Sequence, residues 1–235
     1  MAKYLRELTI EGTGMFPENK AGWKQFNGET SYIDEAFYAK LKRNVPSGIR
    51  KLIISIEPIT AENESFDLAK ADYYWDSDLD IFIVDVPFDL EQYLNSTDDQ
   101  KSQIVYELLR TFLQSPFANR HFDVGFLLGI LEELKDAGFA YVIENKKRAM
   151  NPGKTKGVRY HKVYTLNEMS VYALLSGKKA MPEDKLLIGT FDDYYSGLSA
   201  DSKSSIAFID ENTIAYYEQR GGRGPMQLQF TKELE

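Results

Sequence analysis

The hydrophobic pattern of the first part of the chain predicts strands and one helix. Residues 4–12, YLRELTIEG, alternate apolar and polar positions, which is typical of a half-buried strand. Residues 12–30 contain four glycines and a proline, so a long surface loop is expected there. Ile33, Phe37 and Leu41 then recur at a helical spacing, which predicts a helix beginning at Ser31 or Asp34.

Two further strands are predicted after this helix. The segment IRKLIISIEPI, residues 49–59, has consecutive apolar positions and is interrupted by Pro58. The segment DLDIFIVDVPF, residues 78–88, contains the apolar run Ile81–Val84, which is typical of a strand in the middle of a sheet. Residues 1–97 are therefore expected to form a small α/β layer.

Two helices are predicted next. The first shows an apolar stripe at Ile104, Leu108, Leu109 and Phe112, with Asp98 or Asp99 placed to cap it. The second is expected to run from Asp123 to Gly138, because glycine commonly ends a helix in the left-handed conformation.

The rest of the chain is predicted to be rich in strands. Residues 139–144 and 158–166 are expected to flank a turn-rich loop, and residues 204–219 to form a hairpin before a last strand near Met226–Phe230. The predicted class is α+β, in three parts: the layer 1–97, a central module 98–176, and antiparallel strands at 183–235 that pack on the first layer.

The central module resembles the winged helix-turn-helix superfamily over residues 99–172. The order is helix, turn, helix ending LEELKDAGF, strand, basic loop, and strand ending YTL; the matching positions are Leu131, Leu134, Ala137, Gly138, Phe139, Val142, Tyr164, Thr165 and Leu166. The resemblance implies a recognition helix and a wing that lies along a nucleic-acid backbone. Winged modules that serve as protein docking surfaces are the alternative.

Composition removes several kinds of site. The chain has no cysteine, so it has no disulfide, thiolate nucleophile or sulfur-bound zinc. His121 and His161 are the only histidines, so any metal would need carboxylate ligands, and neither a cofactor nor a metal is expected. The sequence shows no signal peptide and no long apolar run, which predicts a soluble, cytoplasmic protein with no membrane partner.

Charge is distributed unevenly. Residues 57–99 contain 13 acids and one base, Lys70, a formal charge of −12, whereas the whole chain carries −8. The aromatic run Tyr73–Trp75 lies inside this segment. Acidic charge beside exposed aromatic residues is typical of a surface that attracts and anchors a basic protein. The main expectation is therefore a non-enzymatic binding protein, such as an immunity or inhibitor protein for a basic toxin, and the expected partner-binding residues are Asp72, Tyr73, Tyr74, Trp75, Asp76 and Asp78.

A basic loop favours a second hypothesis, a nucleic-acid-binding regulator. Residues 146–162 contain seven lysines and arginines and no acid. On the winged-helix resemblance this loop is the wing, and the residues implied to meet phosphates are Lys146, Lys147, Arg148, Lys154, Lys156 and Arg159. A hairpin tip made basic for solubility explains the loop equally well.

An enzyme is the third hypothesis. Asp78 and Asp80 are two residues apart before a buried strand, so on a strand they would share a face and could hold magnesium, as in nucleotidyltransferases. The glycine-rich turn that cradles nucleotide phosphates is missing, since there is no glycine between Gly48 and Gly125. Asp78 and Asp80 are therefore expected to be structural or to face a partner.

Overall fold

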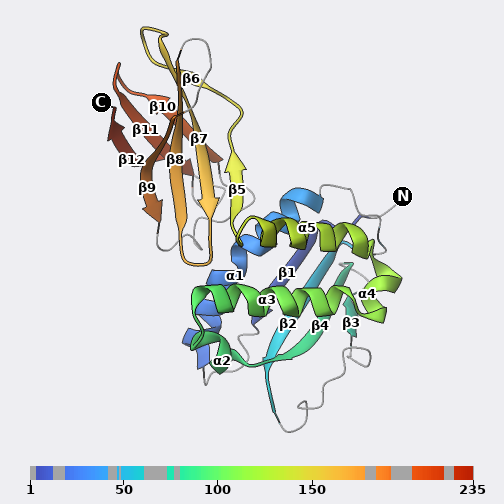
Figure 1. Ribbon diagram of the computed structural model, residues 1–235. Helices are drawn as coiled ribbons and strands as arrows, with labels where there is room; N and C mark the ends of the chain where they lie inside the picture. Colours follow the sequence, from blue (N-terminus) through green and yellow to red (C-terminus); the bar gives the residue numbers. More distant parts are fainter. Residues whose placement is uncertain are drawn as a thin grey trace. The chain divides into compact units, whose positions relative to one another are not determined.

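The computed structural model describes residues 4–12, 19–41, 47, 49–60, 73–76, 80–177, 184–191, 203–219 and 225–234. The chain divides into two compact units, residues 1–139 and 140–235. The first unit contains helices and strands and the second contains strands, which confirms the α+β class (Figure 1). Within the described ranges, no helix is long and apolar enough to cross a membrane.

The first unit is built on a four-stranded sheet. Its strands are β1 (Glu7–Gly12), β2 (Lys51–Pro58), β3 (Tyr73–Asp76) and β4 (Ile81–Phe88), in the order β1-β2-β4-β3. β1, β2 and β4 are parallel, and β3 pairs antiparallel with β4 at the edge. The prediction that Ile81–Val84 belongs to an inner strand is confirmed, because β4 lies between two neighbours.

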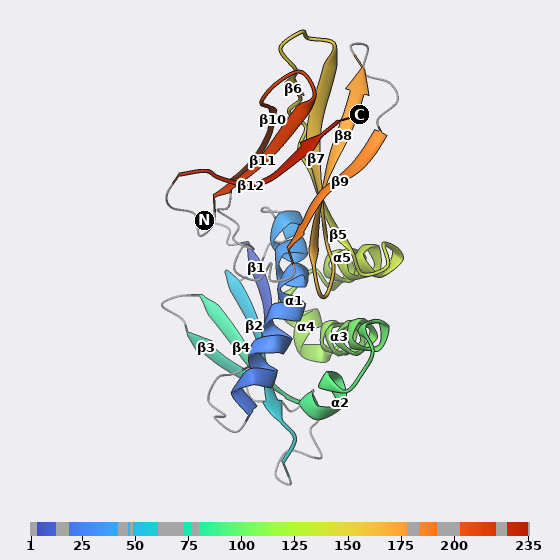
Figure 2. The same cartoon turned by 90° about the vertical axis from the view of Figure 1, so that its left-hand side faces the viewer.

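The helices cover one face of this sheet. Burial alternates along β1 and β4, so that Ile10, Phe82 and Val84 lie on the covered face. Figure 2 shows α1 (Lys20–Leu41), α3 (Asp98–Leu113) and α5 (Val124–Asp136) together on one side of the sheet. The opposite face, turned away from the helices, carries the alternate residues of each strand.

The expected long loop before Ser31 is wrong over its second half. α1 begins at Lys20 and has 22 residues, and its buried positions Trp23, Phe26 and Thr30 extend the stripe of Ile33 and Phe37 backwards at helical spacing. Two glycines lower the intrinsic helix propensity of this segment, but packing of its apolar face against the sheet outweighs that cost.

The two helices predicted after Asp98 and from Asp123 are present as α3 and α5, with one change at a cap. Thr97, not Asp98 or Asp99, caps α3, and Thr97 and Gln100 form a reciprocal capping box. Asp123 caps α5 through Phe126 N–H, and Gly138 follows with a φ of +66°. Two short helices, α2 (Leu90–Leu94) and α4 (Pro116–His121), complete the unit.

The second unit consists of antiparallel strands in two sheets. β7 (Lys156–Tyr164) and β8 (Met169–Gly177) are the long inner strands of one sheet, whose other members are β5 (Tyr141–Glu144), β6 (Ala149–Met150) and β9 (Asp184–Phe191). The other sheet is the predicted hairpin β10 (Lys203–Phe208) and β11 (Thr213–Gln219), followed by β12 (Gln227–Glu233). The fully buried residues of the second unit include Val158, Val171 and Ile214, which come from both sheets.

This division differs from the three predicted parts. The helices of residues 98–136 belong to the first unit and the strands of residues 141–177 to the second, so the central module 98–176 is split. The tail 183–235 joins those strands, since β9 pairs with β8 along Met169–Leu175. The winged-helix resemblance spans both units and stays a prediction.

Candidate functional site

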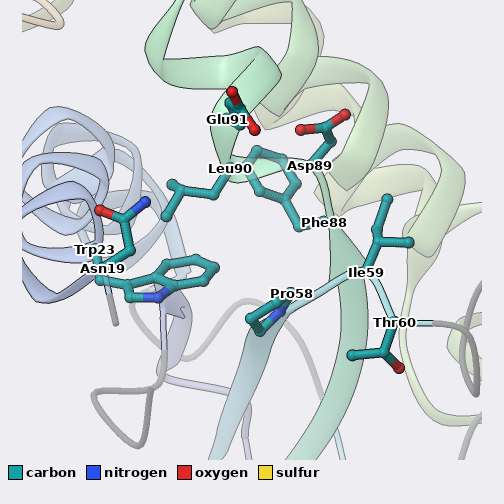
Figure 3. A pocket seen from close by; sticks show the side chains of 9 residues that line it. All are labelled: Asn19, Trp23, Pro58, Ile59, Thr60, Phe88, Asp89, Leu90 and Glu91. Carbon is teal, nitrogen blue, oxygen red and sulfur yellow. The ribbon is translucent and has the colours of Figure 1, made fainter. Parts of the chain in front are cut away.

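A cavity of about 570 Å³ lies at the carboxyl ends of β2 and β4 in the first unit (Figure 3). Pro58, Ile59 and Thr60 line it from the end of β2, and residues 88–91 from the end of β4 and the start of α2. Asn19 and Trp23 line it from the start of α1. Ligands of open sheets with parallel strands commonly bind at this edge, and the volume is in the range of small-molecule sites.

An aromatic cluster fixes the apolar wall of the cavity. The ring of Phe26 is 6.4 Å from Trp23, 5.1 Å from Phe88 and 5.0 Å from Tyr93, in edge-on arrangements. Gly12 lies directly against the indole of Trp23, where a Cβ would overlap the ring. Behind the cluster, Lys101 Nζ is 2.8 Å from Glu29 Oε1 in a buried ion pair. Trp23 and Phe88 are therefore held in place before any ligand arrives.

The polar groups of the cavity are mostly acceptors. Asp89 caps α2 by accepting a hydrogen bond from Gln92 N–H at 2.8 Å, and the neighbouring Glu91 is exposed. Asn19 Oδ1 accepts from Gly22 N–H at 3.3 Å. Trp23 is only 2% exposed, and its indole N–H has no acceptor among the described residues. Among the described residues that line the cavity, two are carboxylates and none is basic.

Strand register gathers acids and an aromatic ring on the sheet face opposite the helices. Tyr74 pairs with Ile83 across β3 and β4, and Ser55 pairs with both Glu11 and Asp85 across the parallel strands. Alternation along each strand places Glu57 with Ser55 and Asp85 with Ile83. We call Glu11, Glu57, Tyr74, Ile83 and Asp85 the outer sheet face. Tyr74 is 63% exposed there and Asp85 is exposed.

The acids of the outer sheet face affect one another. Burial raises the pKa of Glu57 above its ordinary value, and the nearby charge of Asp85 adds to the increase. Like charges held close together on one surface favour a positively charged partner, which would relieve their repulsion.

The six predicted partner-binding residues are described only in part. Tyr73–Asp76 form the edge strand β3, and the side chain described among them is that of Tyr74. Asp72 and Asp78 lie outside the described residues. Local composition makes Tyr74 a candidate, but it does not show which acids from other strands lie on the same face.

The basic loop is a structured turn, and three of the six residues predicted to contact phosphates bind other groups of this chain. Arg148 Nη2 donates to the carbonyls of Ser176, at 3.2 Å, and Gly177 at the end of β8. Lys156 Nζ donates to Asn212 Oδ1 at 3.0 Å, and Arg159 lies 3.6 Å from Glu144 Oε2. Lys146, Lys147 and Lys154 are exposed.

The buried side chain of Asn151 organises this turn. Its Oδ1 accepts from the N–H groups of Thr155 and Lys156, and its Nδ2 donates to Glu211 Oε2 at 2.7 Å. Glu211 belongs to the turn between β10 and β11, so an acid from that turn faces the basic one. Part of the loop's charge is therefore balanced within the second unit.

The predicted pair Asp78 and Asp80 is not assembled on a strand. Asp80 occupies a turn before β4 with a φ of 57°, and its carbonyl accepts from Arg50 and Lys51 N–H, while Asp78 lies outside the described residues. Within the described part of the chain, no three histidine, aspartate or glutamate side chains gather closely enough to hold a metal ion.

A buried ion pair in the second unit was not anticipated. Lys162 on β7 and Glu218 on β11 are almost fully buried, with Nζ 2.6 Å from Oε1, and they join the two sheets. Ser204 and Tyr216 also donate to Glu218 Oε1. Alternation along β7 places Lys162 on the same face as Tyr160 and Tyr164. A lysine between two aromatic residues on one strand face was the sequence feature that could have indicated a buried charge.

The cavity also went unpredicted. Trp23 lines the cavity from α1, and the glycines of residues 12–30 made this part of the chain look like a loop. Trp23, Phe26, Ile33 and Phe37 at helical spacing were the signal that could have revealed it.

Comparison with protein-family models, with curated proteins and with solved structures finds no match for this chain.

Proposed function

We propose that the protein binds a basic protein partner through the outer sheet face. The observation that carries this proposal is the 63% exposure of Tyr74 on an edge strand, with exposed Asp85 and half-buried Glu57 on the same face. A tyrosine on a sheet contributes a large, stiff contact area and a hydroxyl group. The surrounding carboxylates attract a cationic surface and accelerate association.

The edge position of β3 adds backbone groups to this surface. β3 pairs with β4 on one side and ends the sheet on the other, so its outer N–H and C=O groups face no strand of the described sheet. Edge strands commonly accept an added strand from a partner. A basic partner segment in extended form would combine these hydrogen bonds with contacts to Tyr74 and Asp85.

Nucleic-acid binding is the competing function. It ranks second because half of the basic residues predicted to contact phosphates already have partners in this chain. Three of its six predicted contacts, Arg148, Lys156 and Arg159, have partners within the second unit. A site made of the remaining lysines would neutralise about three phosphates and so bind weakly.

Affinity capture from the native host tests the proposal. The expected result is a basic partner whose capture falls about tenfold or more with Tyr74→Ala, because a central aromatic contact commonly contributes about 2 kcal/mol. Tyr38→Ala is the matched control, since Tyr38 is a 43% exposed tyrosine on α1. Equal capture by the two variants, or recovery of nucleic acid in place of a basic protein, contradicts the proposal.

A further inference from the structure

We infer that the cavity at the carboxyl ends of β2 and β4 binds a small organic ammonium ion with an apolar body. This site is separate from the outer sheet face, because its lining residues come from the ends of the strands and the starts of α1 and α2. The proposed partner binding does not require it.

The shape and the apolar lining define the body of the ligand. The cavity of about 570 Å³ has walls formed by Trp23, Phe88, Leu90, Pro58 and Ile59. Contact with these groups removes apolar surface of the ligand from water, which is the main source of affinity in sites of this size. Gly12 and the ring of Phe26 hold the indole in place, so binding does not have to order it.

The charged and aromatic groups define the head of the ligand. Asp89 and Glu91 lie beside the apolar walls, and the described lining includes no lysine, arginine or histidine. A ligand with a phosphate or carboxylate would be repelled there. An ammonium group is attracted both by the carboxylates and by the faces of Trp23 and Phe88, since aromatic rings attract cations. Figure 3 shows Asp89, Glu91, Trp23 and Phe88 among the side chains that line the pocket.

The remaining polar groups select for one acceptor on the ligand. The indole N–H of Trp23 is itself buried, so the donor left to a bound ligand is the amide of Asn19. Asn19 Oδ1 accepts a hydrogen bond from Gly22 N–H, and the side-chain NH₂ of Asn19 can donate to a ligand. An amine that also carries a hydroxyl or ether oxygen therefore fits better than a plain amine.

A fluorescence titration tests this site. The chain has two tryptophans, so in a Trp75→Phe background the emission reports Trp23. The probes are 2-phenylethylamine and 3-phenylpropanoate, which have similar shapes and opposite charges. The amine is expected to change the emission saturably with a dissociation constant on the order of 1 mM, as ligands of this size allow, and the carboxylate to leave it unchanged.

Two double variants show whether the cavity carboxylates are responsible. Asp89→Asn/Glu91→Gln keeps the size of both side chains and a good helix cap, and is expected to weaken amine binding about tenfold or more. Asp98→Asn/Asp99→Asn removes two charges from the start of α3 and is expected to leave binding unchanged. Calorimetry on the wild-type chain with the same probes serves if Trp75→Phe does not fold. Equal binding of both probes, unchanged affinity in Asp89→Asn/Glu91→Gln, or no saturation up to about 50 mM would each overturn the inference.

Discussion

Asp34 makes the stability of the first unit depend on pH. It lies in α1, and its Oδ1 accepts a hydrogen bond from Ile10 N–H of β1 at 3.0 Å. Burial raises the pKa of Asp34 well above its ordinary value of 3.8, against the opposing effect of that hydrogen bond. The protonated form is therefore favoured in the folded state. Its stabilising contribution is complete below pH 3.8 and is lost as the pH rises through the raised pKa.

Asp34→Asn is expected to be more stable than the wild type at pH 7 and to show a flatter dependence of stability on pH above 4. The amide keeps an acceptor for Ile10 N–H and removes the titrating group. Thermal unfolding between pH 4 and 8 measures this, with Asp99→Asn on the exposed surface of α3 as the control. A lower melting temperature for Asp34→Asn at pH 7 would contradict the assignment.

The Lys162–Glu218 pair is expected to show strong coupling in a double-mutant cycle. Burial lowers the pKa of Lys162, and the charge and hydrogen bond of Glu218 oppose that effect. Lys162→Met leaves a buried carboxylate and Glu218→Gln leaves a buried ammonium, so each is expected to destabilise the chain by about 3–5 kcal/mol. Lys162→Met/Glu218→Gln removes both charges and keeps an acceptor for Ser204 and Tyr216.

Denaturant unfolding of the four chains in this cycle gives the coupling energy. The double variant is expected to be at least about 2 kcal/mol more stable than additivity predicts. Additive losses would show that the two charges are already solvated in the folded chain.

The segment between β5 and β6 contains bases of two kinds, which stability measurements can separate. Arg148 donates to carbonyls at the end of β8, and its Nε is buried, whereas Lys147 is exposed. Arg148→Ala is expected to destabilise the second unit by about 1–3 kcal/mol, because the part-buried carbonyl of Ser176 loses a charged donor. Lys147→Ala is expected to change stability by less than about 0.5 kcal/mol. Equal effects of the two substitutions on chemical unfolding would contradict the division.

Helices and strands with strong local patterns were predictable from the sequence. The inner strand at Ile81–Val84, the helix from Asp123 to Gly138 and the hairpin around Asp210 all follow from apolar periodicity and turn residues. The start of α1 was not predictable in this way, because tertiary packing of Trp23 and Phe26 outweighs the local glycines.

Features that depend on pairing between distant segments were less accessible. The outer sheet face needs the register of β1, β2, β3 and β4, and the cavity needs the parallel arrangement of β2 and β4. A single sequence gives the face of each strand but not its neighbours. Local composition is enough to make Tyr74 a candidate, whereas the placement of Trp23, Asp89 and Glu91 along one cavity depends on the arrangement of the strands.

Across the whole molecule, opposite charges mark different units. The outer sheet face and the cavity carboxylates belong to the first unit, and the basic turn at residues 146–156 belongs to the second. The exposed charge of the first unit predicts a cationic partner. In the second unit, Lys146, Lys147 and Lys154 are the exposed members of the six residues predicted to contact a phosphate backbone.

Fluorescence anisotropy with two labelled probes distinguishes binding of a cationic protein segment from binding of nucleic acid. A labelled oligoarginine peptide is expected to bind, to weaken as salt is added, and to lose about tenfold or more affinity with Tyr74→Ala/Asp85→Asn, because arginine pairs with carboxylates and stacks on aromatic rings. Tyr38→Ala/Asp99→Asn should bind like the wild type. Labelled duplex DNA is expected not to bind. Binding of a basic partner by the outer sheet face is contradicted if the peptide does not bind or binds all variants equally. It is also contradicted if the duplex binds with a log–log salt slope of roughly −3 that Lys146→Ala/Lys147→Ala/Lys154→Ala abolishes.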